Sequence, residues 1–119
     1  MQNPFLSSAG PRFVHRDDII ALAGRVARRI AETHPEVLQV LLFGSFARQD
    51  YGIRSDIDLL VVLRSSNRAP IDRLKEFMQE TPAYPTDIIA YTEEELRSKV
   101  DSSDPFLSRA LREAIQLYP

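Results

Sequence analysis

Two aspartates that stand one residue apart, Asp56 and Asp58, have the types and spacing best suited to chemistry in this sequence. Asp56 directly precedes the apolar run IDLLVVL, residues 57–63, and Asp58 is its second residue; this run predicts a strand. Because side chains alternate along a strand, both carboxylates point the same way, about 6.6 Å apart along it. Two carboxylates this close stay ionised together only if cations neutralise them; otherwise one takes up a proton.

Oxygen ligands in a chain without cysteine favour a hard cation, Mg²⁺ first. Two such ions about 3.5–4 Å apart are the standard device for in-line phosphoryl or nucleotidyl transfer. Asp87 is the candidate third carboxylate, because it starts another apolar run, residues 87–91. A lone Asp-x-Asp is equally typical of a solvated strand start, so the metal site needs a second observation.

That second observation is Gly44-Ser45, which directly follows the apolar run VLQVLLF, residues 37–43. Glycine lets a backbone N–H approach a ligand closely. Ser45 offers a hydroxyl and can open a short helix whose N-terminus favours an anion. The combination predicts a site with one edge built for phosphates and the other for metal.

The elements that must position these residues follow from periodicity and punctuation. They are a helix from Asp17 to His34-Pro35, strands at 37–43, 57–63 and 87–91, and helices at 71–80, 93–100 and 105–117. The apolar sides fall on Ile71, Leu74, Phe77 and Met78 in the second helix and on Leu107, Ala110, Leu111, Ala114 and Ile115 in the last. This order predicts an α/β (α+β) fold with a small mixed β-sheet flanked by helices.

Helix starts and domain limits are also indicated. Thr92 and Glu95 form a capping box, and Asp104-Pro105 pairs a capping residue with proline at the first helical position. We expect residues 1–15 to be an N-terminal tail and residues 16–119 to be one domain.

Composition narrows the classes of function. The chain has 119 residues, a formal net charge of -2 and no cysteine. There is no basic field to attract nucleic acid directly, and no thiolate metal site or cysteine nucleophile. The apolar runs are too short to span a bilayer, and the N-terminus lacks the pattern of a signal peptide. A cytoplasmic location is therefore expected, without membrane contact.

The segments GSFAR (44–48) and SDIDLLV (55–61) resemble the signature of the DNA polymerase β-type nucleotidyltransferases. The spacing and small size are most similar to the minimal nucleotidyltransferases, and the segment 104–119 is also similar to the end of those chains. The resemblance implies the polymerase β-type fold, with Asp56, Asp58 and Asp87 as catalytic residues and ligands of two Mg²⁺ ions. Asp87 would also be the base for the acceptor hydroxyl.

The same resemblance implies a nucleotide-binding set. Gly44 and Ser45 would hold the β- and γ-phosphates of ATP, joined by Arg48 and Ser55. For Arg48, packing of the short helix and contact with phosphate both stay open. The family usually has glycine at the position of Gln49, and the next glycine here is Gly52, so we expect the loop to turn later.

The function implied is that of an antitoxin in a toxin–antitoxin module. Minimal nucleotidyltransferases commonly pair with HEPN-domain RNase toxins and neutralise them by transferring AMP from ATP to a tyrosine. Since little chain follows the third strand, we expect the acceptor surface to come from a partner or from a second subunit of a homo-oligomer. The alternatives are a binding-only antitoxin with a vestigial nucleotide site, and a nucleotidyltransferase acting on a small molecule.

Overall fold

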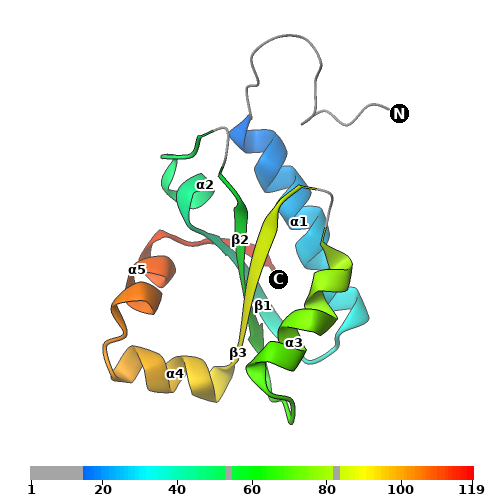
Figure 1. The fold of residues 1–119 in the computed structure, drawn as a ribbon, viewed down its shortest axis with the longest axis vertical. Coiled ribbons are helices and arrows are strands. Elements are labelled where there is room, and N and C mark those ends of the chain that lie inside the picture. Colours follow the sequence, from blue (N-terminus) through cyan, green and yellow to red (C-terminus); the bar gives the residue numbers. More distant parts are fainter. Residues whose placement is uncertain (1–14, 53–54, 82–83) are drawn as a thin grey trace.

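The computed structural model describes residues 15–52, 55–81 and 84–119, so the predicted tail lies outside the described residues except for His15. A four-stranded sheet in the order β3-β2-β1-β4 has helices on both faces (Figure 1). The elements in chain order are α1 (Arg16–Thr33), β1 (Val37–Phe43), α2 (Ser45–Arg48), β2 (Ile57–Leu63), α3 (Pro70–Phe77), a 3-10 turn η2 (Met78–Glu80), β3 (Thr86–Thr92), α4 (Glu93–Asp101), α5 (Pro105–Glu113) and β4 (Ile115–Tyr118). The predicted α/β fold with a mixed sheet is confirmed.

The sheet is mixed because its central strands pair in both senses. β1 is antiparallel to β2 and to β4, whereas β2 and β3 are parallel. Every residue of β2 except Asp58 is buried. This matches the continuous apolar run in the sequence, which predicted cover on both faces.

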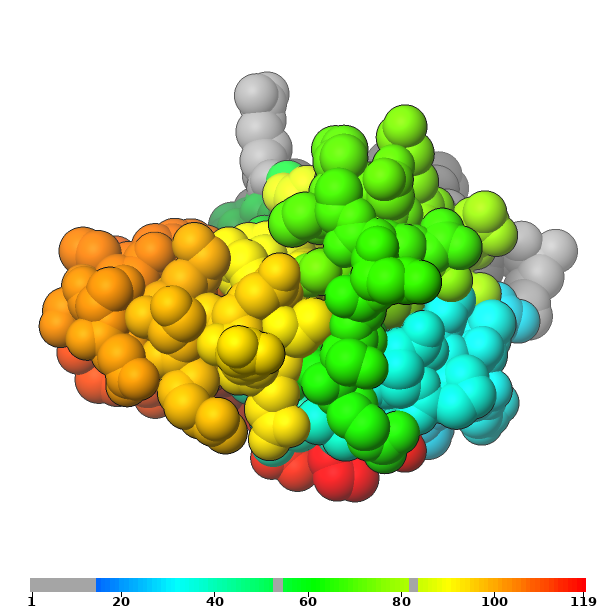
Figure 2. Space-filling model, turned by 90° about the horizontal axis from the view of Figure 1, so that it is seen from below, coloured from blue at the N-terminus to red at the C-terminus, as the bar shows by residue number. Residues whose placement is uncertain are grey.

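Two apolar cores lie on the two faces of the sheet. Residues 40 and 42 of β1 and residues 57, 59, 61 and 63 of β2 pack with the buried side of α1 and with Phe77 of α3. The opposite face carries Leu41, Phe43, Leu60 and Val62 against Leu107 and Ala110 of α5. Figure 2 shows α4 and α5 in yellow and orange at the opposite end of the molecule from the C-terminal part of α1 in cyan.

Local signals fix the starts of α4 and α5 as predicted. The Thr92 side chain accepts a hydrogen bond from the Glu95 N–H at 3.1 Å, and the Thr92 N–H donates to the Glu95 carboxylate at 2.8 Å. Asp104 accepts from the Leu107 N–H at 3.0 Å, with Pro105 at the first helical position. None of the helices in the described ranges combines the length and hydropathy that a bilayer span requires.

The predicted last helix, residues 105–117, is wrong at its C-terminal end. Helix α5 ends at Glu113, Ala114 is extended (φ -67°, ψ 148°), and Ile115–Tyr118 forms the edge strand β4. Ile115 pairs with Leu42 and packs against the core on the α1 side. A short apolar segment satisfies helical and strand spacing equally, and here the exposed edge of β1 provides hydrogen-bond partners that a longer helix would leave unpaired.

Candidate active site

Asp58 occupies an interior position of the sheet that the apolar pattern reserves for a core residue. Its side chain lies on the same face of β2 as those of Leu60 and Val62, which are buried against α5 and its neighbours. In the sheet Asp58 pairs with Phe43 of β1 on one side and with Asp87 of β3 on the other. Paired strands lie about 4.8 Å apart, so the two aspartates meet on one face without any coordinating loop.

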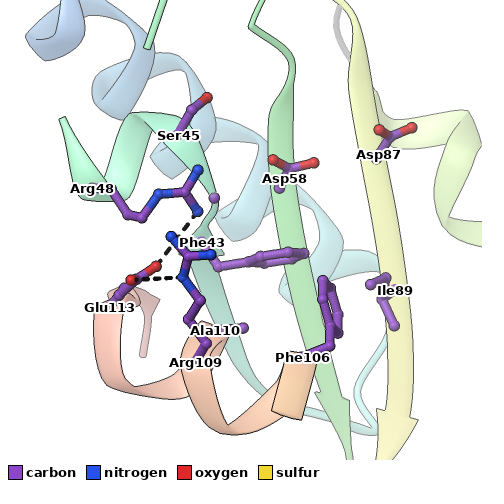
Figure 3. Close-up of a pocket in the computed structure, with 11 residues that line it drawn as sticks. Phe43, Ser45, Arg48, Asp58, Asp87, Ile89, Phe106, Arg109, Ala110 and Glu113 are labelled. Atoms are coloured by element: carbon purple, nitrogen blue, oxygen red, sulfur yellow. Dashed lines mark hydrogen bonds and ion pairs between the residues drawn. The ribbon is translucent and has the colours of Figure 1, made fainter. Parts of the chain in front are cut away.

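A cavity of about 580 Å³ opens beside these carboxylates, between the sheet, α2 and α5 (Figure 3). Five of the seven site residues predicted from the sequence line it, namely Gly44, Ser45, Arg48, Asp58 and Asp87. The remaining lining residues are Phe43, Ile89, Phe106, Arg109, Ala110 and Glu113. Ser45 and Asp58 thus face one space, although the predicted loop between them separates them in the chain.

The electrostatics of the cavity are dominated by carboxylates. Burial is the largest cause of the shift at Asp58, and together with the negative charges of Asp87 and Asp56 it raises the pKa of Asp58 from 3.8 to about 6. The nearby Arg48 acts in the opposite direction and does not cancel it. The carboxylates around Asp58 therefore outweigh the effect of Arg48 on its ionisation, which fits the binding of a cation or a proton.

The donor set fits a divalent cation that takes part of its coordination from a substrate. Within the described ranges, no three His, Cys, Asp or Glu residues are already arranged to hold a metal ion. The residues available are oxygen donors alone, with Asp58 and Asp87 on the cavity and Asp56 two residues from Asp58. Mg²⁺ is commonly bound by one or two carboxylates plus water and phosphate oxygens, which is what this arrangement offers.

Gly44 is packed directly against the Asp58 carboxylate. Its backbone has φ 77° and ψ -156°, a conformation almost restricted to glycine. A Cβ at this position would overlap the Asp58 Oδ2 atom and lie 3.0 Å from its Cγ. Glycine is thus required twice, once for the turn from β1 into α2 and once for the close approach of backbone to carboxylate.

The turn after α2 falls at Gln49, so the expectation that the loop turns later, near Gly52, is wrong. Gln49 adopts the left-handed conformation with φ 71°, and its N–H donates to the Ser45 carbonyl. Gly44 is the glycine with positive φ among the described residues, and Gly52 is not. Because the Gln49 side chain is exposed, the turn costs only the backbone energy of a left-handed residue.

Arg48 connects α2 to α5. Its guanidinium donates to Asp50 at 3.0 Å and to Glu113 at 3.5 Å. The hydrogen bond to Asp50, followed by smaller contributions from Glu113, raises the pKa of Arg48 despite some burial. Arg48 thus ties the two elements together, and it also lines the cavity next to Ser45.

Ser55 and Asp56 lie beside the cavity and do not line it. The Ser55 hydroxyl accepts a hydrogen bond from the Gly52 N–H at 2.8 Å, and its carbonyl accepts from the Tyr84 hydroxyl at 3.0 Å. The pKa of Tyr84 is raised by burial and by the charge of Asp56. The charge of Asp56 therefore raises the pKa of two groups, Asp58 on the cavity and Tyr84 outside it.

Helix α5 supplies cavity residues that the sequence analysis did not single out. Phe106 is 53% exposed and meets Phe43 edge to face, with ring centroids 5.7 Å apart. Arg109 donates to Glu113 at 3.1 Å, four residues along the helix. The i,i+4 spacing of Arg109 and Glu113 was a usable signal for a helical pair, but nothing local showed that this helix faces the Asp58 strand.

A mixed sheet with carboxylates on its two parallel strands is what the resemblance to the nucleotidyltransferases implies. A family model described as "Polymerase beta, Nucleotidyltransferase" matches residues 27–115, about three quarters of the chain. The chain therefore belongs to this nucleotidyltransferase family. No curated protein sequence matches it.

Solved structures similar to this chain have low sequence identity to it. A protein of Sulfolobus solfataricus that is provisionally classed as a nucleotidyltransferase superposes with a TM-score of 0.64 at 24% identity, over 85% of this chain and 80% of that one. Two toxin–antitoxin crystal structures, one with AMP-PNP and one of an MntA–HpeT mutant, have TM-scores of 0.49 and 0.47. Each is 20% identical, over 88% of this chain and 73% of the other.

Proposed function

We propose that this chain, with residues 16–119 as its catalytic domain, is a cytoplasmic enzyme that uses Mg²⁺ to transfer AMP from ATP to a hydroxyl group. The observation that carries the proposal is the pairing of Asp58 with Asp87 across β2 and β3, on a cavity whose opposite rim is Gly44, Ser45 and Arg48. Carboxylates and phosphate-binding groups on one cavity are what nucleotidyl transfer requires.

The residues divide the work by position. Asp56, Asp58 and Asp87 would hold two divalent cations, which supply a Lewis acid that draws charge from the α-phosphate. Gly44, Ser45 and Arg48 hold the β- and γ-phosphates at the other rim, and Ser55 supports the turn behind them. Asp87, the more exposed of the two paired aspartates, takes the proton of the acceptor hydroxyl. The hydroxyl oxygen bonds to the α-phosphorus as the bond to pyrophosphate breaks.

The acceptor we propose is a tyrosine of a HEPN-type toxin, which makes the chain an antitoxin. This rests on the likeness of GSFAR and SDIDLLV to the minimal nucleotidyltransferases. Two properties of the chain support a protein acceptor over a nucleic acid. The formal net charge is -2, and the rim of the cavity carries an exposed aromatic side chain, Phe106. Phosphate backbones reward clustered lysine and arginine instead.

The test uses ATP labelled at the α-phosphate, Mg²⁺ and lysate from the native host. Asp58→Asn should reduce labelling at least about a hundredfold, because it removes one of the carboxylates proposed to hold the divalent cations. Asp101→Asn, at an exposed position on α4, makes the same charge change far from the cavity and should leave labelling intact.

The labelled product decides between the functions. Label on one small protein supports the antitoxin enzyme and identifies its partner by mass. Label on a small metabolite supports the same chemistry on another acceptor, and contradicts the antitoxin target. If a toxin partner is present and binds but no label depends on Asp58, the chain is a binding-only antitoxin.

A further inference from the structure

The cavity contains a second arginine, Arg109, whose position points to a role with the phosphates. We infer that Arg109 and Arg48 form a clamp for a polyphosphate chain, with Glu113 as the internal anion that competes for both. This inference rests on the proposed function, since it concerns the triphosphate end of the same nucleotide. It assigns a binding role to α5, which lies outside the Gly-Ser and Asp-x-Asp motifs.

The geometry brings both guanidiniums to one carboxylate. Arg48 Nη1 lies 3.5 Å from Glu113 Oε2, and Arg109 Nε lies 3.1 Å from Glu113 Oε1. Each oxygen of Glu113 therefore serves one arginine. Figure 3 shows the two guanidiniums next to each other at the rim that also carries Ser45, with Asp58 and Asp87 across the cavity. This is the rim where the proposed function places the β- and γ-phosphates.

Most of the donors in this cluster are not used by Glu113. A guanidinium has five N–H donors in a planar fork that matches carboxylate and phosphate oxygens. Arg109 makes one hydrogen bond in the described part of the chain, to Glu113, and its side chain is 59% exposed. Arg48 also pairs with Asp50, whose side chain is 58% exposed. Both arginines can therefore reach a phosphate while α5 stays in place.

The charges explain why a polyphosphate would displace Glu113. Two guanidiniums side by side repel each other, and a bridging anion relieves that repulsion. Glu113 supplies one negative charge, whereas a triphosphate supplies several, each with strong acceptor oxygens. Glu113 therefore keeps the arginines together and gives way to the more highly charged ligand.

If these contacts were purely structural, removing them would change the stability of the chain only slightly. Exposed i,i+4 pairs such as Arg109–Glu113 add little to the stability of a helix, and exposed ion pairs often contribute nothing measurable. Such a role would also make polyphosphate affinity independent of Arg109. The clamp predicts the reverse, a large effect on binding and a small one on folding.

The experiment measures binding of inorganic tripolyphosphate with Mg²⁺ to the full chain by calorimetry. Arg109→Ala should raise the dissociation constant about tenfold, the value of one charge-assisted hydrogen bond, and Arg109→Lys should recover part of the loss. Arg112→Ala is the matched control, because Arg112 is exposed on the same helix and does not line the cavity. Glu113→Gln should tighten binding several-fold by removing the competing charge. Thermal unfolding of each variant confirms that it folds.

Two results would overturn the clamp: no difference between Arg109→Ala and Arg112→Ala, or a Glu113→Gln variant that binds as weakly as Arg109→Ala. Tripolyphosphate has no nucleoside to transfer, so the outcome does not depend on the acceptor. Arg109-dependent binding without Asp58-dependent labelling would sustain the clamp and reject the proposed transfer. Asp58-dependent labelling with Arg109-independent binding would sustain the transfer and reject the clamp.

Discussion

Two carboxyl groups at opposite ends of the same sheet, Asp58 and Glu95, are held in opposite electrostatic environments. Glu95 follows the end of β3 and accepts two hydrogen bonds from Arg73, at 2.6 and 3.2 Å. These bonds, with smaller help from Thr92, lower the pKa of Glu95 to about 2 although burial opposes the shift. Asp58 begins the partner strand β2 among other carboxylates, and its pKa rises to about 6.

The difference separates a structural carboxylate from a reactive one. Arg73 is buried and also donates to the carbonyl of Arg68 and the hydroxyl of Ser66, so the Glu95 cluster is complete without a ligand. At Asp58, burial and like charge act together, and among the residues that the structure describes the opposing effect of Arg48 does not cancel them. A cation or substrate that binds in a cavity gains the most electrostatic stabilisation beside a charged group that the protein leaves uncompensated.

The largest effect on stability is expected from removing the ion pair between Arg73 and Glu95. Arg73→Met should lower the free energy of unfolding by about 2–4 kcal/mol, because it leaves carbonyl and carboxylate acceptors without their buried donor. Urea denaturation measures this. Arg97→Met, at an exposed position on α4, is the control and should change stability by less than about 0.5 kcal/mol. Equal effects of the two variants would mean that the Arg73–Glu95 pair is not a structural centre.

A substitution at Gly44 disturbs the surroundings of Asp58 through the backbone rather than through the carboxylates. Gly44→Ala should cost about 2–3 kcal/mol, from strain at positive φ and from overlap with the Asp58 carboxylate. In an Asp58→Ala background the cost should fall, since the atoms that the new Cβ meets most closely are gone. Denaturation of all four proteins gives the coupling energy.

The matched control for that cycle is Gly24→Ala. Gly24 is a residue of α1 where an added Cβ would come no closer than 4.0 Å to its nearest neighbour, Arg28. Alanine favours the helix there by about 0.5–1 kcal/mol, so this variant should be more stable than the parent. If Asp58→Ala leaves the cost of Gly44→Ala unchanged, the close approach is not what makes glycine necessary.

The pH dependence of stability should differ in sign between the two carboxyls. Between pH 3.8 and about 6 the folded chain keeps the Asp58 proton that the unfolded chain releases, so stability falls as pH rises through this window. Solvent screening at this half-buried group limits the loss to on the order of 1–2 kcal/mol. Glu95 acts the other way, and its contribution disappears as pH falls from 4.5 toward 2.

Unfolding free energies measured from pH 3 to 7 test this contrast. Asp58→Asn should flatten the curve between pH 4 and 6, and Glu95→Gln should flatten it below pH 4.5. A curve for Asp58→Asn that follows the parent through the upper window would show that Asp58 is not the group that titrates there.

The sequence predicted the parts of the site that depend on strand starts and turns. Asp58 and Asp87 each stand near the beginning of a strand, and parallel pairing was enough to bring them together. Gly44 and Ser45 directly follow β1, so their place at the end of that strand could also be predicted from the local sequence. The contribution of α5 was missed, because only the packing of the chain decides which helix faces the carboxylates.

Tertiary packing also departs from the hydrophobic pattern in the predicted helix at residues 71–80. The second helix was expected to turn Ile71 and Met78 inward, but they are 59% and 42% exposed. Arg73 was not among the residues of the predicted apolar side, yet it is 4% exposed because Glu95 comes to it from a helix far along the chain. A charged residue can be buried only where a partner arrives, and periodicity does not report partners.

The smallest expected effect concerns the residue where the family usually has glycine. Gln49 is left-handed and exposed, so Gln49→Gly should stabilise the chain by about 0.5–1 kcal/mol through relief of backbone strain. Gln49→Ala removes the same side chain without relieving the strain and should not stabilise. Thermal unfolding of both variants separates backbone from side-chain effects. If alanine and glycine act alike, the side chain of Gln49 has a role that its exposed position does not reveal, and the turn itself is not the source of the strain.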